Sequence, residues 1–135
     1  MSIWSDSLLI GVARIDHQHK ELVKKLDDLM EACRKGEGDA EIEKTLRFAV
    51  SYVKEHFHDE EELQAQYAYP DMDSHKKLHA EFVMRIIDLV QEFQKSGANI
   101  ELTTKVNKTL VVWLVNHIRT EDKKLGEHIK HAGGA

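Results

Sequence analysis

Four stretches of this 135-residue chain carry apolar residues at the spacing of an α-helix, and polar residues interrupt each apolar stripe. The interrupting residues are five imidazoles and one carboxylate, namely His19, His56, Glu60, His75, His79 and His117. Residues four apart lie on one face of a helix, so His56 points with Glu60, and His75 points with His79. The pattern therefore predicts a helical protein with a polar layer inside its core.

The apolar stripes also predict where the helices begin and end. We expect an extended arm followed by four helices, at residues 1–15, 16–36, 40–65, 70–96 and 99–130. Asp16 is the expected N-cap of the first helix, Gly36 and Gly38 mark its expected end, and Pro70 suits the first turn of the third helix. Short connections between helices of similar length imply antiparallel neighbours. The expected fold is all-α, an up-down-up-down antiparallel four-helix bundle in a single domain spanning residues 1–135.

Composition excludes several classes of function. The formal net charge is −5 and the Lys and Arg residues are scattered, which argues against a nucleic-acid partner. No apolar run approaches the roughly 20 residues that cross a bilayer, and no signal peptide opens the chain, so we expect no membrane partner. The single cysteine, Cys33, cannot form an internal disulfide and suits a cytoplasmic protein. Charged outer faces leave no second apolar stripe, so we expect a monomer.

The six polar residues should meet in one layer near one end of the bundle. His19, His75 and His79 lie at helix starts, whereas His56, Glu60 and His117 lie late in their helices. A single histidine on an apolar face is usually a core histidine bonded to a carbonyl, but five histidines with a glutamate in one layer need another explanation. A buried carboxylate without a cationic partner costs several kcal/mol. Metal ions would supply the missing positive charge.

Asp122 is a further candidate ligand on the fourth helix. It follows His117 by five residues, which places it about 140° around an α-helix, on a stripe with Leu114, Ile118 and Leu125. A carboxylate that bridges two metals need not share the face of a histidine bound to one of them. Alternatively, a local widening of the helix would bring Asp122 towards the face of His117.

The types of ligand limit the chemistry but leave the metal open. Imidazole suits iron, copper, nickel and zinc, whereas carboxylate bridges suit paired hard ions. Five imidazoles, two bridging carboxylates and a bridging oxide or hydroxide would leave one position of two octahedral ions open for a small ligand. If the two ions are iron, the excess of neutral imidazoles over carboxylates should favour the diferrous state and the release of dioxygen.

These residues resemble the hemerythrin family along nearly the whole chain. The matching segments are Asp16-His17-Gln18-His19-Lys20, His56-Phe57-His58-Asp59-Glu60-Glu61, Tyr69-Pro70 with His75-Lys76-Lys77-Leu78-His79, and Trp113-Leu114-Val115-Asn116-His117-Ile118 continuing to Asp122. The resemblance implies two iron ions joined by an oxo or hydroxo bridge. One iron would bind His75, His79 and His117, the other would bind His19 and His56, and Glu60 with Asp122 would bridge them.

The same resemblance implies a function. Dioxygen would bind reversibly, as hydroperoxide, at the iron held by His19 and His56, and would serve transport, storage or sensing. The family's apolar dioxygen pocket would be formed by Phe57, Trp113, Leu114 and Ile118, although ordinary core packing explains Phe57 and Trp113 about as well. The remaining histidines, His17, His58, His128 and His131, are expected to be solvated.

Other functions stay open at this point. A di-iron peroxidase or nitric-oxide scavenger could use the same centre, but no acid or base is evident beside the open position, so we do not expect an enzyme. A sensory module of a chemotaxis-type signalling protein would have a partner domain outside this sequence. Metal storage or zinc binding could use the same ligands.

Overall fold

The computed structural model describes residues 4–34, 38–97 and 99–133, and this part of the chain contains helices but no strand. Three long helices come first: α1 (Ala13–Arg34), α2 (Gly38–Gln66) and α3 (Met72–Ser96). A fourth rod is built from five consecutive segments, α4 (Ile100–Val106), η2 (Asn107–Val112), α5 (Trp113–His117), η3 (Ile118–Asp122) and α6 (Lys123–His131). The expected all-α fold is confirmed.

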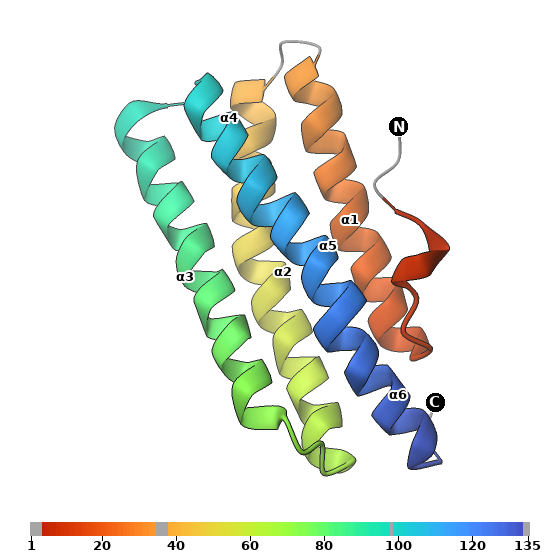
Figure 1. Ribbon diagram of the computed structural model, residues 1–135. Coiled ribbons are helices and arrows are strands. Elements are labelled where there is room, and N and C mark those ends of the chain that lie inside the picture. The colour runs from red at the N-terminus through yellow and green to blue at the C-terminus, as the bar shows by residue number, and fades with distance from the viewer. Residues whose placement is uncertain (1–3, 35–37, 98, 134–135) are drawn as a thin grey trace.

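The four rods lie side by side and alternate in direction (Figure 1). The end of α1, the start of α2, the end of α3 and the start of α4 lie at one end of the bundle, and the α2–α3 connection lies at the other. Consecutive rods pack against each other, α1 on α2, α2 on α3 and α3 on α4. This is the up-down-up-down arrangement that the short connections predicted. In the described residues no helix is both long enough and apolar enough to cross a membrane.

The arm before α1 is more ordered than the predicted extended segment. It contains a short 3-10 turn, η1 (Asp6–Leu8), and it buries the side chains of Leu8 and Ile10 in the core. α1 begins at Ala13, so the prediction of Asp16 as its N-cap is wrong. Asp16 lies in the first turn and its carboxylate accepts hydrogen bonds from the backbone N–H groups of Ile10 (2.8 Å) and Gly11 (3.1 Å). The carboxylate thereby ties the arm to the helix.

The connection between α2 and α3 explains why α3 begins at Met72, two residues after the predicted start at Pro70. The backbone at Ala68 has φ of 49°, a left-handed conformation that ends α2. The N–H of Tyr69 then donates to the carbonyl of Gln64 (2.9 Å), and Pro70 belongs to the turn that follows. The predicted end of the first helix near Gly36, and the side chain of Cys33, lie outside the described residues.

Two segments of the fourth rod, η2 and η3, are π-helical. A π-helix joins residues five apart by hydrogen bonds, so each such segment adds a residue to a turn and widens it. η3 spans Ile118–Asp122, where the sequence offered a local widening as one way to reorient Asp122. The structure confirms that widening.

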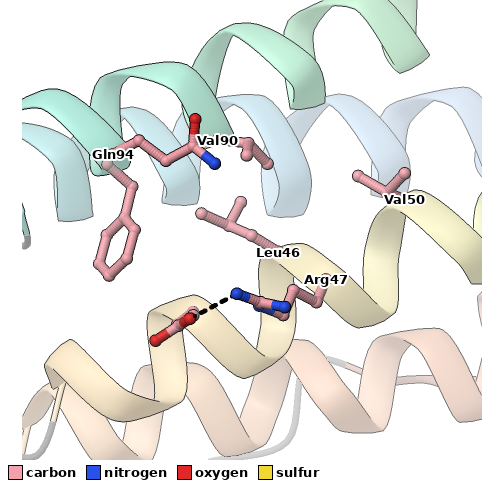
Figure 2. Close-up of a pocket in the computed structure, with 7 residues that line it drawn as sticks. Leu46, Arg47, Val50, Val90 and Gln94 are labelled. Carbon is pink, nitrogen blue, oxygen red and sulfur yellow. Dashed lines mark hydrogen bonds and ion pairs between the residues drawn. The ribbon is translucent and has the colours of Figure 1, made fainter.

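A groove of about 360 Å³ lies between α2 and α3, far from the histidines. Figure 2 shows Leu46 and Val50 of α2 facing Val90 of α3, with Arg47 at the edge bonded to Glu43 at 2.8 Å. Leu46 precedes His56 by ten residues, which is about 15 Å along the helix. The groove is therefore separate from the polar layer.

Candidate metal centre

The structure brings all seven predicted ligands into one layer of the core. None of their side chains is more than 5% exposed, and they are His19, His56, Glu60, His75, His79, His117 and Asp122. α1 contributes one, α2 two, α3 two and the fourth rod two. The layer lies towards the end of the bundle where α2 turns into α3, as the helix directions predicted, because His75 follows the start of α3 by three residues.

Within this layer the side chains form two overlapping groups. In the first, atoms of His75, His79, His117, Glu60 and Asp122 lie within 4.8 Å of one another. The second consists of His19 and His56 with the same two carboxylates, again within 4.8 Å. Each group could hold one metal ion, and the shared members are the two carboxylates.

Glu60 turns one oxygen towards each group. Its Oε2 lies 3.1 Å from Nε2 of His56 and 4.0 Å from Nε2 of His19. Its Oε1 lies 3.0 Å from Nε2 of His75 and 3.5 Å from Nε2 of His79. A carboxylate that bridges two ions needs this division of its two oxygens.

Asp122 is divided in the same way. Its Oδ2 lies 3.1 Å from Nε2 of His19, whereas its Oδ1 lies 3.0 Å from Nε2 of His75 and 3.1 Å from Nε2 of His117. The π-helical turn η3 makes the last contact possible, because a regular α-helix would place Asp122 about 140° from His117. Backbone geometry therefore supplies the second shared carboxylate.

The buried charges stabilise one another in the absence of metal. Burial and the charge of Asp122 oppose ionisation of Glu60, but the close imidazoles of His56, His75 and His79 lower its pKa below the usual value. Burial likewise opposes ionisation of Asp122, and the charge and hydrogen bond of His117 lower its pKa. Burial would lower the pKa of His75, but Asp122 and Glu60 outweigh it and raise that pKa to about 10.

The donor set fits metal ions. Every imidazole turns its Nε2 towards the shared carboxylates, and the Nε2 atoms of His19 and His56 lie only 3.1 Å apart, as do those of His75 and His117. Nε2 of His79 has no hydrogen-bond partner among the described residues, although it is buried. Converging nitrogen and oxygen donors of this kind are what a divalent or trivalent transition-metal ion requires.

Two of the four residues predicted to line an apolar pocket stack on imidazoles of the centre. Phe57 lies 3.7 Å from the ring of His79, with 2° between the planes, and Trp113 lies 4.6 Å from the ring of His117, with 10° between the planes. The other two, Leu114 and Ile118, are buried on the fourth rod. Phe57 and Trp113 thus cover the rings of His79 and His117.

The remaining histidines behave differently from one another. His17 and His58 are exposed and each pairs with a glutamate four residues on, as solvated residues do. His131 is exposed as well. The prediction that His128 is solvated is wrong: it is partly buried, and its Nε2 donates to the carbonyl of Tyr67 (2.7 Å). This carbonyl lies just after the end of α2, where backbone groups need partners from outside the helix.

Sequence reasoning missed the residues that contact the imidazoles from outside. Gln18 bonds to Nδ1 of His56 (2.7 Å), and Glu61 bonds to Nδ1 of His79 (3.0 Å). Each is the direct chain neighbour of a predicted ligand, Gln18 of His19 and Glu61 of Glu60. That adjacency was a signal, but it did not show which ring each side chain would reach, because both rings belong to other helices.

Comparison with known proteins agrees with this geometry. Residues 10–129 match the family model of the hemerythrin HHE cation binding domain. The chain belongs to the hemerythrin family. Hemerythrins are iron-based oxygen-binding proteins, so membership supports that role at the level of the family.

Individual hemerythrins are similar over most of their length. A bacteriohemerythrin of Stenotrophomonas maltophilia is 31% identical over 95% of this chain and 81% of its own. A bacteriohemerythrin of Pseudomonas aeruginosa is 32% identical over 96% of this chain and 82% of its own. A myohemerythrin of Theromyzon tessulatum is 31% identical over 90% of this chain and 88% of its own.

Proposed function

We propose that this chain binds dioxygen reversibly at a pair of non-haem iron ions joined by an oxo or hydroxo bridge. One ion is held by His75, His79 and His117, the other by His19 and His56, and the carboxylates of Glu60 and Asp122 bridge the two. The observation that carries the proposal is the divided orientation of both carboxylates, each with one oxygen at either group of imidazoles. When bound, the iron pair supplies the electrons that dioxygen accepts.

The balance of ligands favours reversible binding over oxidation of a substrate. Five imidazoles are neutral donors, and only two carboxylates add negative charge to the pair. Carboxylate-rich bundle sites stabilise higher oxidation states, whereas this set favours the ferrous state from which dioxygen is released. Carriage, storage and sensing of dioxygen all use this same property.

The apolar residues around the centre protect the bound gas from water and protons. The side chains of Leu114 and Ile118 are no more than 1% exposed. Phe57 and Trp113 pack on the rings of His79 and His117 and hold them at a fixed angle. An apolar, rigid surrounding of this kind slows irreversible oxidation, because charge separation is costly where water is excluded.

Metal analysis and optical spectroscopy test the proposal together. Protein loaded anaerobically with ferrous iron should contain two iron ions per chain and be nearly colourless. A visible absorption band should appear in air and disappear when inert gas replaces the air. One iron per chain, a tightly held zinc that iron cannot replace, or permanent bleaching after one exposure to air would each contradict the proposal.

A further inference from the structure

The side chain of Gln18 connects a proposed metal ligand, His56, to Asp59, which is not a proposed ligand. Its Oε1 lies 2.7 Å from Nδ1 of His56, and its Nε2 donates to Oδ2 of Asp59 at 2.7 Å. Gln18 belongs to α1, whereas His56 and Asp59 belong to α2. The amide is therefore held at both ends across a helix interface.

Its orientation follows from the charges around it. Asp59 also pairs with Arg14, Nη2 to Oδ1 at 2.9 Å, so its carboxylate is an acceptor only. The amide nitrogen of Gln18 must face that carboxylate, which leaves the amide oxygen facing His56. An amide oxygen accepts only, so the hydrogen of the neutral His56 ring lies on Nδ1, and the lone pair of Nε2 points at the centre.

The backbone of Gln18 is held as well. The hydroxyl of Tyr52, on α2, lies 3.1 Å from the carbonyl oxygen of Gln18 and 3.0 Å from Oε2 of Glu21. The ring of Tyr52 stacks on Phe48, 4.9 Å between centroids. Side chain and main chain of Gln18 are thus both attached to the helix that carries His56.

The corresponding position on the other group of imidazoles has a different acceptor. Nδ1 of His79 bonds to the carboxylate of Glu61 at 3.0 Å. A charged acceptor makes an imidazole a stronger donor to its metal, whereas a neutral amide does so less. The two groups therefore differ in their outer hydrogen bonds as well as in their number of histidines.

We propose that Gln18 is a positioning residue of the metal centre: it fixes the His56 ring with Nε2 towards the ion, and its neutral amide favours the ferrous state. Only the effect on the ferrous state rests on the proposed function; the orientation of the His56 ring does not. The arrangement from Arg14 through Asp59 and Gln18 to His56 is a property of the folded chain. The acceptor on His56 is an amide, and the acceptor on His79 is a carboxylate. Replacing the amide by a carboxylate and replacing the carboxylate by an amide should therefore move the reduction potential in opposite directions.

Metal affinity tests the positioning role. The variant Gln18→Met keeps the length of the side chain and removes both polar atoms, and Gln66→Met makes the same change at an exposed position of α2. Cobalt(II), used as the probe, should bind Gln18→Met with a dissociation constant about 10- to 100-fold higher, because outer partners of ligating histidines typically contribute this much. The Gln66→Met protein should bind it as the parent does. In the zinc-loaded parent, ¹⁵N spectra should show the hydrogen of His56 on Nδ1.

Equal cobalt affinities for the two methionine variants, or a His56 hydrogen on Nε2 in the zinc-loaded parent, would overturn the positioning role. This arm uses neither iron nor dioxygen, so its result is independent of the proposed function. Failure of the iron-loaded parent to develop the absorption band in air would instead count against the proposed function alone.

The reduction potential tests the electronic role. The double variant Gln18→Glu with Asp59→Asn keeps the net charge and both hydrogen bonds, but moves the negative charge next to His56. The reduction potential of this double variant should be lower than that of Asp59→Asn alone. Glu61→Gln should have a higher reduction potential than the parent, and Glu62→Gln, at an exposed position, is its matched control. Equal potentials for the double and single variants at full iron content would overturn this role, and if the double variant does not fold, the Glu61→Gln comparison decides it.

Discussion

Glu60 and Asp122 are fully buried carboxylates whose stability depends on the imidazoles around them. Desolvation opposes both charges, and hydrogen bonds and charge from the histidines offset it. Removing one member leaves the others without partners, which is costly in a core. At the scale of residues, the centre should therefore respond to substitution as a unit.

Replacing one predicted ligand should lower the iron content. His117→Gln removes a nitrogen donor that contacts Asp122 and His75, so we expect fewer than two iron ions per chain after loading. His58→Gln is the control, because His58 is exposed and bonds only to Glu62 among the described residues. Iron analysis after gel filtration measures both, and equal iron in the two variants would remove His117 from the set of ligands.

The metal-free protein should have a stability maximum in mildly acidic solution. The lowered pKa values of Glu60 and Asp122 contribute stability that is present above about pH 4 and lost as the pH falls through the folded-state values. The raised pKa of His75, about 10, contributes stability that is full below about pH 6.5 and lost as the pH rises towards 10. Each pKa unit corresponds to about 1.4 kcal/mol, so the fall on the alkaline side should be on the order of a few kcal/mol.

Urea unfolding in the presence of a chelator, from pH 4 to 10, measures this profile. Metal-loaded protein should lack the alkaline fall, because a ligating imidazole is already neutral, and loading at pH 7 should release protons to the solvent. A metal-free profile that keeps rising from pH 6.5 to 10 would show that His75 is not charged in the folded state.

At the scale of elements, the π-helical turn η3 decides whether the fourth rod contributes one ligand or two. Inserting one alanine after the exposed Thr120 would place Asp122 six residues after His117, about 120° away around an α-helix, and would rotate everything after the insertion by about 100°. Asp122 would leave the centre, and Leu125 with Ile129 would leave the core. We expect loss of at least half the iron and a decrease in unfolding free energy of about 3 kcal/mol or more.

Iron analysis and urea unfolding measure the effect of this insertion. Insertion of one alanine after Gly133, which follows α6, is the control, because no element lies after it in the described chain. Full iron content after the insertion at Thr120 would show that Asp122 can be replaced or that its position beside His117 is unnecessary.

The contact between the arm and α6 depends on Gly126. A Cβ atom at this position would overlap the carbonyl oxygen of Ile10, so the arm approaches α6 as closely as a glycine permits. Gly126→Ala should lower the unfolding free energy by about 1–3 kcal/mol and make the arm more sensitive to protease. Glu127→Ala, at the exposed neighbouring position, should change neither, and equal stability of the two variants would contradict the packing seen here.

At the scale of the whole molecule, metal and fold should stabilise each other. Four rods converge on one layer; an ion in either group would join three of them, and a pair of ions would join all four. Binding to the folded state alone stabilises it by about 4 kcal/mol when the free metal is 1,000 times its dissociation constant. We expect chelation to lower the midpoint of thermal unfolding, measured by circular dichroism, and re-addition of ferrous iron without oxygen to restore it. A midpoint independent of metal would mean that no ion is held by the folded bundle.

Much of this architecture could be predicted because its signals are local. The helical spacing of apolar residues predicted four rods, and the directions of the rods predicted that His19, His56, Glu60, His75, His79 and His117 would meet. The start of α1 and the role of Asp16 were missed, because that carboxylate bonds to an arm whose path depends on packing against α6. Gln18 and Glu61 were missed for a similar reason, since each contacts an imidazole on another rod.

The sequence by itself determined the type of fold and the residues that carry the chemistry, because helical periodicity and the cost of burying unpaired polar groups are both set by residue type and spacing. Only the tertiary structure decided how those residues are divided. It turned one oxygen of Glu60 and one of Asp122 towards each group of imidazoles, and it used a widened turn to bring Asp122 beside His117. Such orientations depend on the angles between packed helices, which no local spacing specifies.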